Sequence, residues 1–222
     1  KEKEFAVAKV VKNQIKHRIS MEIYIYRHGQ TLYNTKGIVQ GRGVDSSLNE
    51  RGQEEAQAFF ERYQSISFDR LITSTLKRTQ ETAQPFEALG ISVERRSDLD
   101  EIGWGEWEGK KADKPMHAAY LGLLKAWADG DYKRSLVGGD SAEEMGNRLG
   151  SFVAYLKTLK DQKVLICTHG GCLAYLMAIL QGQPLSAMPQ YRHKNTGLCI
   201  FKYDGTHFHL KLQDDISHLN ND

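Results

Sequence analysis

The 222-residue chain lacks the features that would assign it to a membrane, secreted or nucleic-acid-binding class. No window approaches the ~18 apolar residues of a membrane-spanning helix, and the N-terminal residues lack the apolar core of a secretory signal. The formal net charge is only +2, which provides no broad field for nucleic acid or an anionic membrane surface. The three cysteines, Cys167, Cys172 and Cys199, form no CxxC pair. We therefore expect a reduced, cytoplasmic protein with neither nucleic acid nor membrane as partner.

The chain also lacks internal repeats and low-complexity tracts, and it has only four prolines. One continuous domain over residues 21–222 is therefore favoured. Residues 1–20 form a separate basic extension, because they hold six Lys or Arg against two Glu. Apolar residues in this extension fall near helical spacing, which predicts an amphipathic helix or a frayed tail. Met21 could be the native start, since the regular pattern begins there.

Apolar patterns predict strands and helices in alternation. Short buried strands are expected at residues 22–26, 68–73 and 163–168, and helices at 49–63, 77–89 and 141–160. The last of these helices begins with a capping box formed by Ser141 and Glu144. Near the C-terminus, Asp204-Gly205 joins strands 199–203 and 206–212 in a hairpin. These elements predict an α/β fold, a three-layer sandwich with a mostly parallel central sheet and an antiparallel C-terminal edge.

Residues 103–138 interrupt this alternation. They are rich in Trp, Gly and Lys, contain Pro115, and include one predicted helix near 116–128 without a matching strand. An insertion of this length is long for a simple connection and often forms a lid or a specificity wall. We therefore predict a small helical lid beside the functional site.

Three of the predicted strands are followed by residues that carry chemistry. Arg27-His28-Gly29 follows the first strand, Ser74 and Lys77-Arg78 follow the second, and His169-Gly170-Gly171 follows the third. Ligands bind beyond the carboxyl ends of the strands in an open α/β sheet. Either histidine alone would more often be structural, but their joint placement with two arginines favours a functional site.

The residues at this edge suit an anion with several oxygens. Guanidinium groups present a fork of donors that matches phosphate, and Gly170-Gly171 opens an apolar helical run whose free amides attract an anion. Nearby arginines disfavour the protonated form of His28, which lowers its pKa and leaves a nitrogen able to attack phosphorus. His169 is better suited to donate a hydrogen bond to the transferring phosphoryl group.

An ordered set of motifs resembles the histidine phosphatase superfamily, which includes the cofactor-dependent phosphoglycerate mutases. The first motif is Arg27-His28-Gly29-Gln30-Thr31, with Asn34 three positions on. The similarity continues, in the family's order, through Gln40-Gly41, residues 48–52, residues 74–79, Glu101, residues 105–109, residues 139–141 and residues 168–171. The first motif alone would be a weak match, but the ordered set spans residues 22–212 and is very specific.

The resemblance implies a role for each matching residue. His28 would be the phosphorylated nucleophile, and Arg27, Arg78 and His169 would complete the phosphate pocket. Glu101 matches the family's proton donor. Four further positions would contact phosphate or substrate, namely Asn34, Gln40, Gly41 and Gly170. The resemblance also implies catalysis without a metal or any other cofactor.

The assignment of Glu101 faces competition from four acids in the same loop, Asp98, Asp100, Glu106 and Glu108, and any of these could be a solvated surface group. A carboxyl group that acts as an acid needs a raised pKa. A wall formed by Trp104 and Trp107 would raise the pKa of Glu101 by desolvation, and the arginines would oppose that rise.

Other interpretations of single residues are less favoured. The nearest candidates for a metal site are Asp98, Asp100 and Glu101, or His207 with His209. A nucleophilic thiol at Cys167 or Cys172 is disfavoured, because each lies in an apolar run where cysteine packs as a small hydrophobe. No functional role is assigned to four other histidines, His17, His117, His193 and His218.

Several departures favour a phosphatase over a mutase. Mutases of the family add a basic segment after the proton donor, whereas residues 110–138 contain no tight Arg-Arg pair followed by a proline run. Gln30 and Tyr33 also resemble the phosphatase branch. The sequence thus predicts a phosphomonoesterase for a small phosphorylated metabolite, active as a monomer or homodimer. A mutase and a phospho-ligand binding protein without turnover stay open. Candidate substrates are sugar phosphates, phosphoglycerate, a fructose bisphosphate and the nucleoside-like phosphate of cobalamin synthesis.

Overall fold

The computed structural model describes residues 20–219. The basic extension predicted at residues 1–20 therefore lies outside the described residues, apart from Ser20. Within the described part of the chain, no helix is long and apolar enough to cross a bilayer.

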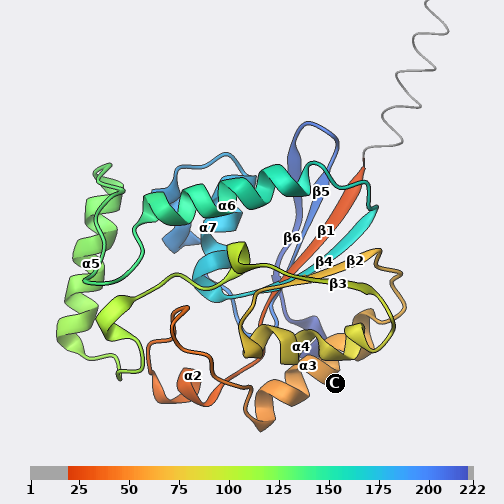
Figure 1. Ribbon diagram of the computed structural model, residues 1–222, viewed down its shortest axis with the longest axis horizontal. Coiled ribbons are helices and arrows are strands. Elements are labelled where there is room, and N and C mark those ends of the chain that lie inside the picture. The colour runs from red at the N-terminus through yellow and green to blue at the C-terminus, as the bar shows by residue number, and fades with distance from the viewer. Residues whose placement is uncertain (1–19, 220–222) are drawn as a thin grey trace, which may run out of the picture.

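One six-stranded sheet forms the centre of the protein (Figure 1). Its strands lie in the order β3-β2-β4-β1-β5-β6, and their bounds are β1 Met21–Arg27, β2 Arg70–Thr73, β3 Ser92–Arg95, β4 Lys163–Thr168, β5 Leu198–Tyr203 and β6 Phe208–Asp215. The first four strands in this order pair in parallel, whereas β5 and β6 add an antiparallel edge. The mostly parallel sheet and its antiparallel C-terminal edge are thus confirmed.

Helices cover both faces of the sheet and bury its apolar side chains. On one face pack α3 (Glu50–Tyr63) and α4 (Lys77–Glu87), and on the other pack α6 (Ala142–Leu156) and α7 (Gly170–Leu180) (Figure 1). Alternation along β1 sends Ile23 and Ile25 into the core with α6 and α7, while Tyr26 stacks on Phe59 of α3 at 4.1 Å. The predicted three-layer sandwich is confirmed.

One strand and one α-helix of the described residues were not predicted from the sequence. The edge strand β3 has only four residues, all at least partly exposed, so it lacks the apolar run that marks the central strands. The short helix α2 (Leu32–Lys36) is closed by a capping box between Thr31 and Asn34. The helix predicted at 141–160 does begin with the Ser141 capping box, but it ends at Leu156.

Residues 103–138 form a wall beside the carboxyl ends of the strands. They contain the 3-10 helix η2 (Gly105–Trp107) and helix α5 (Lys114–Ala128), which stands at the left end of the molecule in Figure 1. Backbone hydrogen bonds join this insertion to Val39, whose N–H donates to the Lys110 carbonyl and whose carbonyl accepts from the Gly109 N–H, both at 2.9 Å. The insertion is therefore anchored on the segment that follows α2.

Candidate active site

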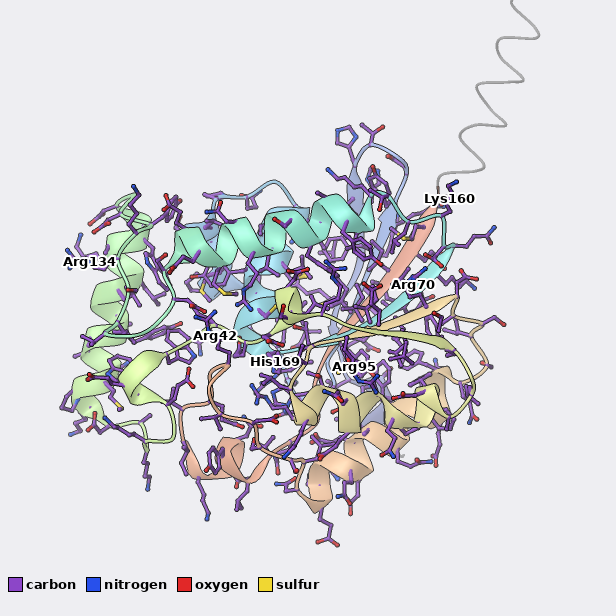
Figure 2. All side chains as sticks on the ribbon, in the orientation of Figure 1. Arg42, Arg70, Arg95, Arg134, Lys160 and His169 are labelled. Carbon is purple, nitrogen blue, oxygen red and sulfur yellow. The ribbon has the colours of Figure 1, made fainter. Side chains whose placement is uncertain are left out.

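Three parallel strands bring the predicted residues to one edge of the sheet. Strand β4 lies between β2 and β1, so His28, Ser74 and His169 all emerge where these strands end. Figure 2 labels His169 at this end, whereas Arg70, at the start of β2, and Lys160, before β4, lie toward the other end. The ring centroids of His28 and His169 are 5.3 Å apart. The two histidines are therefore neighbours, as their motifs predict.

His28 is held as a neutral imidazole with one nitrogen free. Its side chain is 3% exposed, and Nδ1 lies 2.7 Å from the Gly29 carbonyl oxygen. A carbonyl oxygen can only accept, so Nδ1 carries the hydrogen and Nε2 keeps its lone pair. Burial, followed by the charges of Arg27 and Arg78, lowers the pKa of His28 well below its usual value. His28 therefore presents an unprotonated nitrogen at neutral pH.

Arg78 is a fully buried cation whose hydrogen bonds go only to neutral groups. Its Nε donates to Nδ1 of His169 (3.0 Å), Nη1 to the Val44 carbonyl (2.6 Å) and Nη2 to the Gly41 carbonyl (3.3 Å). Burial lowers the pKa of Arg78, and the nearby charge of Glu101 opposes the shift. No carboxylate forms an ion pair with Arg78 within residues 20–219. A buried charge without a partner is costly, so this guanidinium favours an anion.

Arg27 adds a second cation, partly buried, at the end of β1. Its Nη1 donates to the His193 carbonyl (2.8 Å), and its buried Nε has no hydrogen-bond partner within the described residues. Burial lowers the pKa of Arg27, and the charge of Glu101 opposes this shift most strongly. A Cβ atom on Gly170 would lie 3.3 Å from Arg27 Nε, so glycine leaves room beside the guanidinium.

His169 has both ring nitrogens occupied. Because Nδ1 accepts from Arg78, the neutral ring carries its hydrogen on Nε2, which lies 2.7 Å from Ser74 Oγ. Burial, and then the charge of Arg78, lowers the pKa of His169 well below its usual value. In this arrangement the Nε2 hydrogen of His169 points to Ser74 Oγ, and Nδ1 contacts the Arg78 guanidinium. The predicted hydrogen bond from His169 to a phosphoryl group stays a prediction.

Glu101 caps the N-terminus of α7. Its Oε1 accepts from the backbone N–H groups of Cys172 (2.8 Å) and Ile102 (2.9 Å), and Oε2 accepts from that of Gly171 (3.0 Å). Helix N-termini attract negative charge, and here the charge is supplied by the protein itself. The amides of Gly171 and Cys172 are therefore occupied by Glu101, and the predicted contact between Gly170 and phosphate stays a prediction. A Cβ on Gly171 would lie 2.6 Å from Glu101 Oε1, so this approach requires glycine.

The other acids of the loop are engaged elsewhere or exposed. Asp98 pairs with Arg96, Asp100 accepts from the Thr75 N–H (2.8 Å), Glu108 accepts from the Trp104 N–H (2.8 Å), and Glu106 is exposed. Glu101 alone among the five is buried, at 8% exposure, and its charge acts on both arginines.

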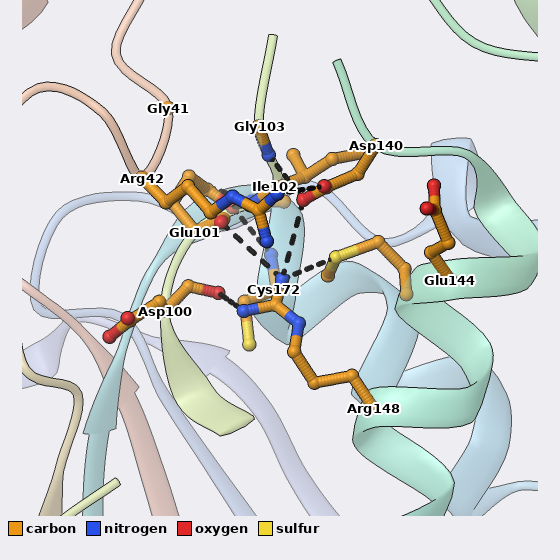
Figure 3. Close-up of polar contacts among 12 residues, drawn as sticks. Gly41, Arg42, Asp100, Glu101, Ile102, Gly103, Asp140, Glu144, Arg148 and Cys172 are labelled. Carbon is orange, nitrogen blue, oxygen red and sulfur yellow. Dashed lines mark hydrogen bonds and ion pairs between the residues drawn. The ribbon is translucent and has the colours of Figure 1, made fainter. Parts of the chain in front are cut away.

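A polar network fixes the backbone around Glu101 (Figure 3). Arg148 of α6 donates from Nη2 to the Glu101 carbonyl (3.4 Å). Asp140 accepts from the Gly103 N–H (2.7 Å) and forms an ion pair with Arg42 (2.7 Å). The position of Glu101 thus depends on residues from both ends of the insertion and from the 41–46 loop.

The remaining predicted contacts build the loop that surrounds Arg78. Gln40 Nε2 donates to Thr31 Oγ1 (2.8 Å), and Asn34 Oδ1 accepts from the Thr31 N–H (3.0 Å). The carbonyl of Gly41 accepts from Arg78. The structure therefore brings Asn34 and Gln40 together on Thr31 and places the Gly41 carbonyl against Arg78.

Residues near the C-terminus also hold the backbone of Arg27 and His28, and no sequence motif predicts these contacts. Asn195 Nδ2 donates to the His28 carbonyl (2.9 Å), and the Thr196 N–H donates to the Arg27 carbonyl (3.0 Å). His218, to which no role was assigned, lies with Nε2 2.9 Å from Thr196 Oγ1. These residues join strands that lie far apart in the sequence, so only the folded chain reveals their part.

Within residues 20–219, the side chains considered for metal binding and for a nucleophilic thiol do not form such a site. No group of three or more His, Cys, Asp or Glu side chains there could hold a metal ion, and His209 pairs with Asp204 (2.8 Å). Cys167 and Cys172 are buried, and burial raises the pKa of each thiol. Neither cysteine therefore presents a reactive thiolate.

A cavity of about 270 Å³ lies between the insertion and the start of the 39–46 segment. Its lining is Val39, Gln40, Trp104, Trp107, Ala112, Met116, His117 and Tyr120. The rings of Trp104 and Tyr120 meet edge to face, with centroids 5.7 Å apart. The cavity wall is thus mostly aromatic and aliphatic.

The fold and this cluster of histidines and arginines define a class of phosphoryl-transfer proteins. The chain belongs to the histidine phosphatase superfamily, whose branch 1 family model matches residues 23–216. The resemblance stated from the ordered motifs is therefore confirmed.

The proteins that this chain resembles are named either as mutases or as phosphatases. "Probable phosphoglycerate mutase GpmB" of Erwinia tasmaniensis is 29% identical over 206 residues, which cover 90% of this chain and 95% of the relative. The structure of alpha-ribazole phosphatase from Shigella flexneri has a TM-score of 0.77 and 26% identity, covering 88% of this chain and 97% of that one. A mycobacterial glucosyl-3-phosphoglycerate phosphatase has a TM-score of 0.75 and 25% identity, covering 88% and 99%. The chain is thus similar to both mutase-like and phosphatase proteins.

Proposed function

We propose that the protein is a phosphomonoesterase that hydrolyses a small phosphorylated metabolite through a phosphohistidine on His28. One observation carries the proposal: a neutral His28, whose pKa is lowered by burial and by the charges of Arg27 and Arg78, lies near two guanidinium groups that have no carboxylate partner within residues 20–219. A phosphate monoester would supply the missing negative charge and bring phosphorus to the nucleophile. Arg27 and Arg78 would then stabilise the charge that spreads over the transferring group.

The reaction would proceed in two displacements at phosphorus. First, Nε2 of His28 forms a bond to phosphorus while the bond to the leaving oxygen breaks, and protonated Glu101 gives its proton to that oxygen. Water then attacks phosphorus and loses a proton to Glu101, while the bond between phosphorus and Nε2 of His28 breaks. This step releases phosphate and regenerates neutral His28. Oε2 of Glu101 accepts one amide hydrogen bond whereas Oε1 accepts two, so Oε2 has the free lone pair for this proton.

The phosphohistidine is the direct test. The protein is mixed with a ³²P-labelled monoester, quenched, and examined for an acid-labile, base-stable phosphoryl group on His28. His28→Ala should abolish both the label and turnover, and Glu101→Gln should slow turnover strongly. An active preparation with no phosphohistidine would sink the mechanism. Activity that survives exhaustive EDTA treatment would support catalysis without a metal.

Phosphoglycerate mutase activity is the second candidate, and the 29% identity to the GpmB relative supports it. The phosphoryl group would then pass from His28 to a second hydroxyl instead of to water. Against this, the cavity beside the site has no Lys or Arg in its lining to meet the carboxylate of phosphoglycerate. NMR of a 3-phosphoglycerate reaction separates the cases, because a mutase forms 2-phosphoglycerate and a phosphatase forms free phosphate. A binding protein without turnover would bind vanadate but would not hydrolyse any phosphate ester.

A further inference from the structure

The cavity beside the phosphate cluster has a lining suited to a ring rather than to a charged chain. We propose that it is a subsite for the substrate's organic part, and that this part is a flat aromatic or apolar ring system. The inference rests on the proposed function and names the class of ester that the protein would hydrolyse.

The chemistry of the lining points to this class. The cavity presents the indole rings of Trp104 and Trp107, the phenol ring of Tyr120 and the flexible side chain of Met116. Aromatic rings bind other rings by stacking and edge-to-face contact, and methionine adapts its shape to an apolar ligand. None of the residues that line the cavity is Lys, Arg, Asp or Glu. A second phosphate or a carboxylate would therefore find no ionic partner in the lining itself, and the charge of Arg192, which is not a lining residue, acts on Tyr120.

The size of the cavity suits a small ring system. Its volume of about 270 Å³ lies just below the ~300–1,000 Å³ of pockets that bury drug-sized ligands. One ring or two fused rings would fit within it. A substrate much larger than this would leave part of its surface in water.

The walls of the cavity are fixed before any ligand binds. The backbone hydrogen bonds between Val39 and residues 109–110 hold its two sides together. The N–H of Trp104 donates to Glu108 Oε1 (2.8 Å), and the Trp104 ring meets that of Tyr120 edge to face. A preformed apolar site loses little conformational entropy on binding, so these aromatic side chains can add to affinity for a ring.

The cavity adjoins the phosphate cluster through neighbouring residues of the chain. Gln40 lines the cavity, and the next residue, Gly41, accepts a hydrogen bond from the Arg78 guanidinium. On the other side, burial raises the pKa of the Tyr120 phenol, and the charges of Arg192 and Glu101 also act on it. An ester whose phosphate sits on Arg78 would thus have its leaving oxygen near Glu101 and its ring between the tryptophans.

Paired substrates and a matched pair of variants test the subsite. The measurement is kcat/KM for 1-naphthyl phosphate divided by kcat/KM for glycerol 3-phosphate. Trp107→Ala should lower this ratio at least tenfold, and Trp107→Phe should retain most of it, because a ring is still present. Leu121→Ala is the control, since Leu121 is 52% exposed on α5 and does not line the cavity; it should leave the ratio unchanged. A ratio that stays within about twofold in a folded Trp107→Ala variant would overturn the inference.

Binding without turnover separates this inference from the proposed function. Calorimetry compares 1-naphthylmethylphosphonate with methylphosphonate, neither of which can be hydrolysed. Tighter binding of the naphthyl compound, lost in Trp107→Ala, supports the subsite even if every ester resists hydrolysis. Equal binding of the two phosphonates overturns it even if the protein is an active phosphatase. If Trp107→Ala does not fold by circular dichroism, Met116→Ser at the partly exposed cavity wall serves as the test variant with the same expected result.

Discussion

Acid should destabilise this protein through histidines that the fold keeps neutral, and His218 gives the clearest test. Its side chain is 5% exposed and packs edge to face on Phe59 at 5.2 Å. Burial lowers the pKa of His218 to about 4, while the charge of Asp215 opposes the shift and that of Arg62 adds to it. His218 also contacts Thr196, whose backbone N–H holds the Arg27 carbonyl. Its protonation state therefore bears on both the fold and the active site.

The sign and size of the effect follow from the two pKa values. In the unfolded chain the pKa of a histidine is about 6.5, and in the folded protein that of His218 is about 4. Between these limits the unfolded state binds more protons, so stability falls as the pH decreases. The contribution of His218 is fully present above about pH 6.5 and is lost progressively toward pH 4. Between pH 7 and pH 5 this loss is about 2 kcal/mol, which is substantial beside a typical total of 5–15 kcal/mol.

The assay is urea unfolding of wild type and His218→Gln at pH 7 and pH 5. Glutamine does not titrate, and its side-chain amide can still bond to Thr196 Oγ1. We expect the free energy of unfolding to fall between the two pH values by about 2 kcal/mol less in the variant than in wild type. Equal pH dependence in the two proteins would refute the conclusion that the fold holds His218 neutral.

Three further predictions concern the site. Because the pKa of His28 lies well below its usual value, phosphohistidine formation should keep its rate from pH 7.5 to pH 6; a loss that follows a pKa near 6.5 in rapid-quench kinetics would contradict a neutral nucleophile. Arg78→Lys loses the fork of guanidinium donors. Hydrogen bonds to charged groups are worth ~1.5–3 kcal/mol, so the inhibition constant of orthovanadate should rise about 10- to 100-fold. Gly171→Ala should lower kcat, because its Cβ would lie 2.6 Å from Glu101 Oε1. The control is Gly150→Ala on α6, where a Cβ would meet no atom within 4 Å. This control should keep kcat and raise the free energy of unfolding by about 0.5–1 kcal/mol. Equal kcat in the two glycine variants would show that Glu101 does not depend on this close approach.

The parts of the fold that the sequence predicts are those with a strong local pattern. The apolar run of β4, in which five of six residues are buried, reads directly as a central strand. The residues that follow β1, β2 and β4 then meet because parallel neighbours end at the same edge. Strand β3 has no such pattern, since it is partly exposed along its length and pairs only with β2. Its place in the sheet is decided by that long-range pairing and leaves no signal in its own four residues.

The partners of the site residues could not be read from the sequence, because they depend on contacts between distant segments. Glu101 and Cys172 are 71 positions apart, and their hydrogen bond places a protein carboxylate at the N-terminus of α7. The contact between Arg78 and His169 joins residues 91 positions apart and changes what the imidazole can donate. Motifs thus identify which residues meet. Only the geometry shows which lone pair or N–H of each residue is left for a ligand.

The charges of Arg27 and Arg78 would bind the phosphate group of a substrate but not distinguish one substrate from another. Arg27 and Arg78 are held by neutral carbonyl and imidazole acceptors, so they would bind the phosphate common to every monoester and would contribute nearly the same energy for each. Uniform binding of that kind cannot separate one substrate from another. Discrimination must therefore come from groups that contact the organic part, and the insertion supplies most of the side chains around the adjoining cavity. If the proposed hydrolysis takes place, the side chains of residues 104–120 that line the cavity are therefore the ones expected to distinguish one ester from another.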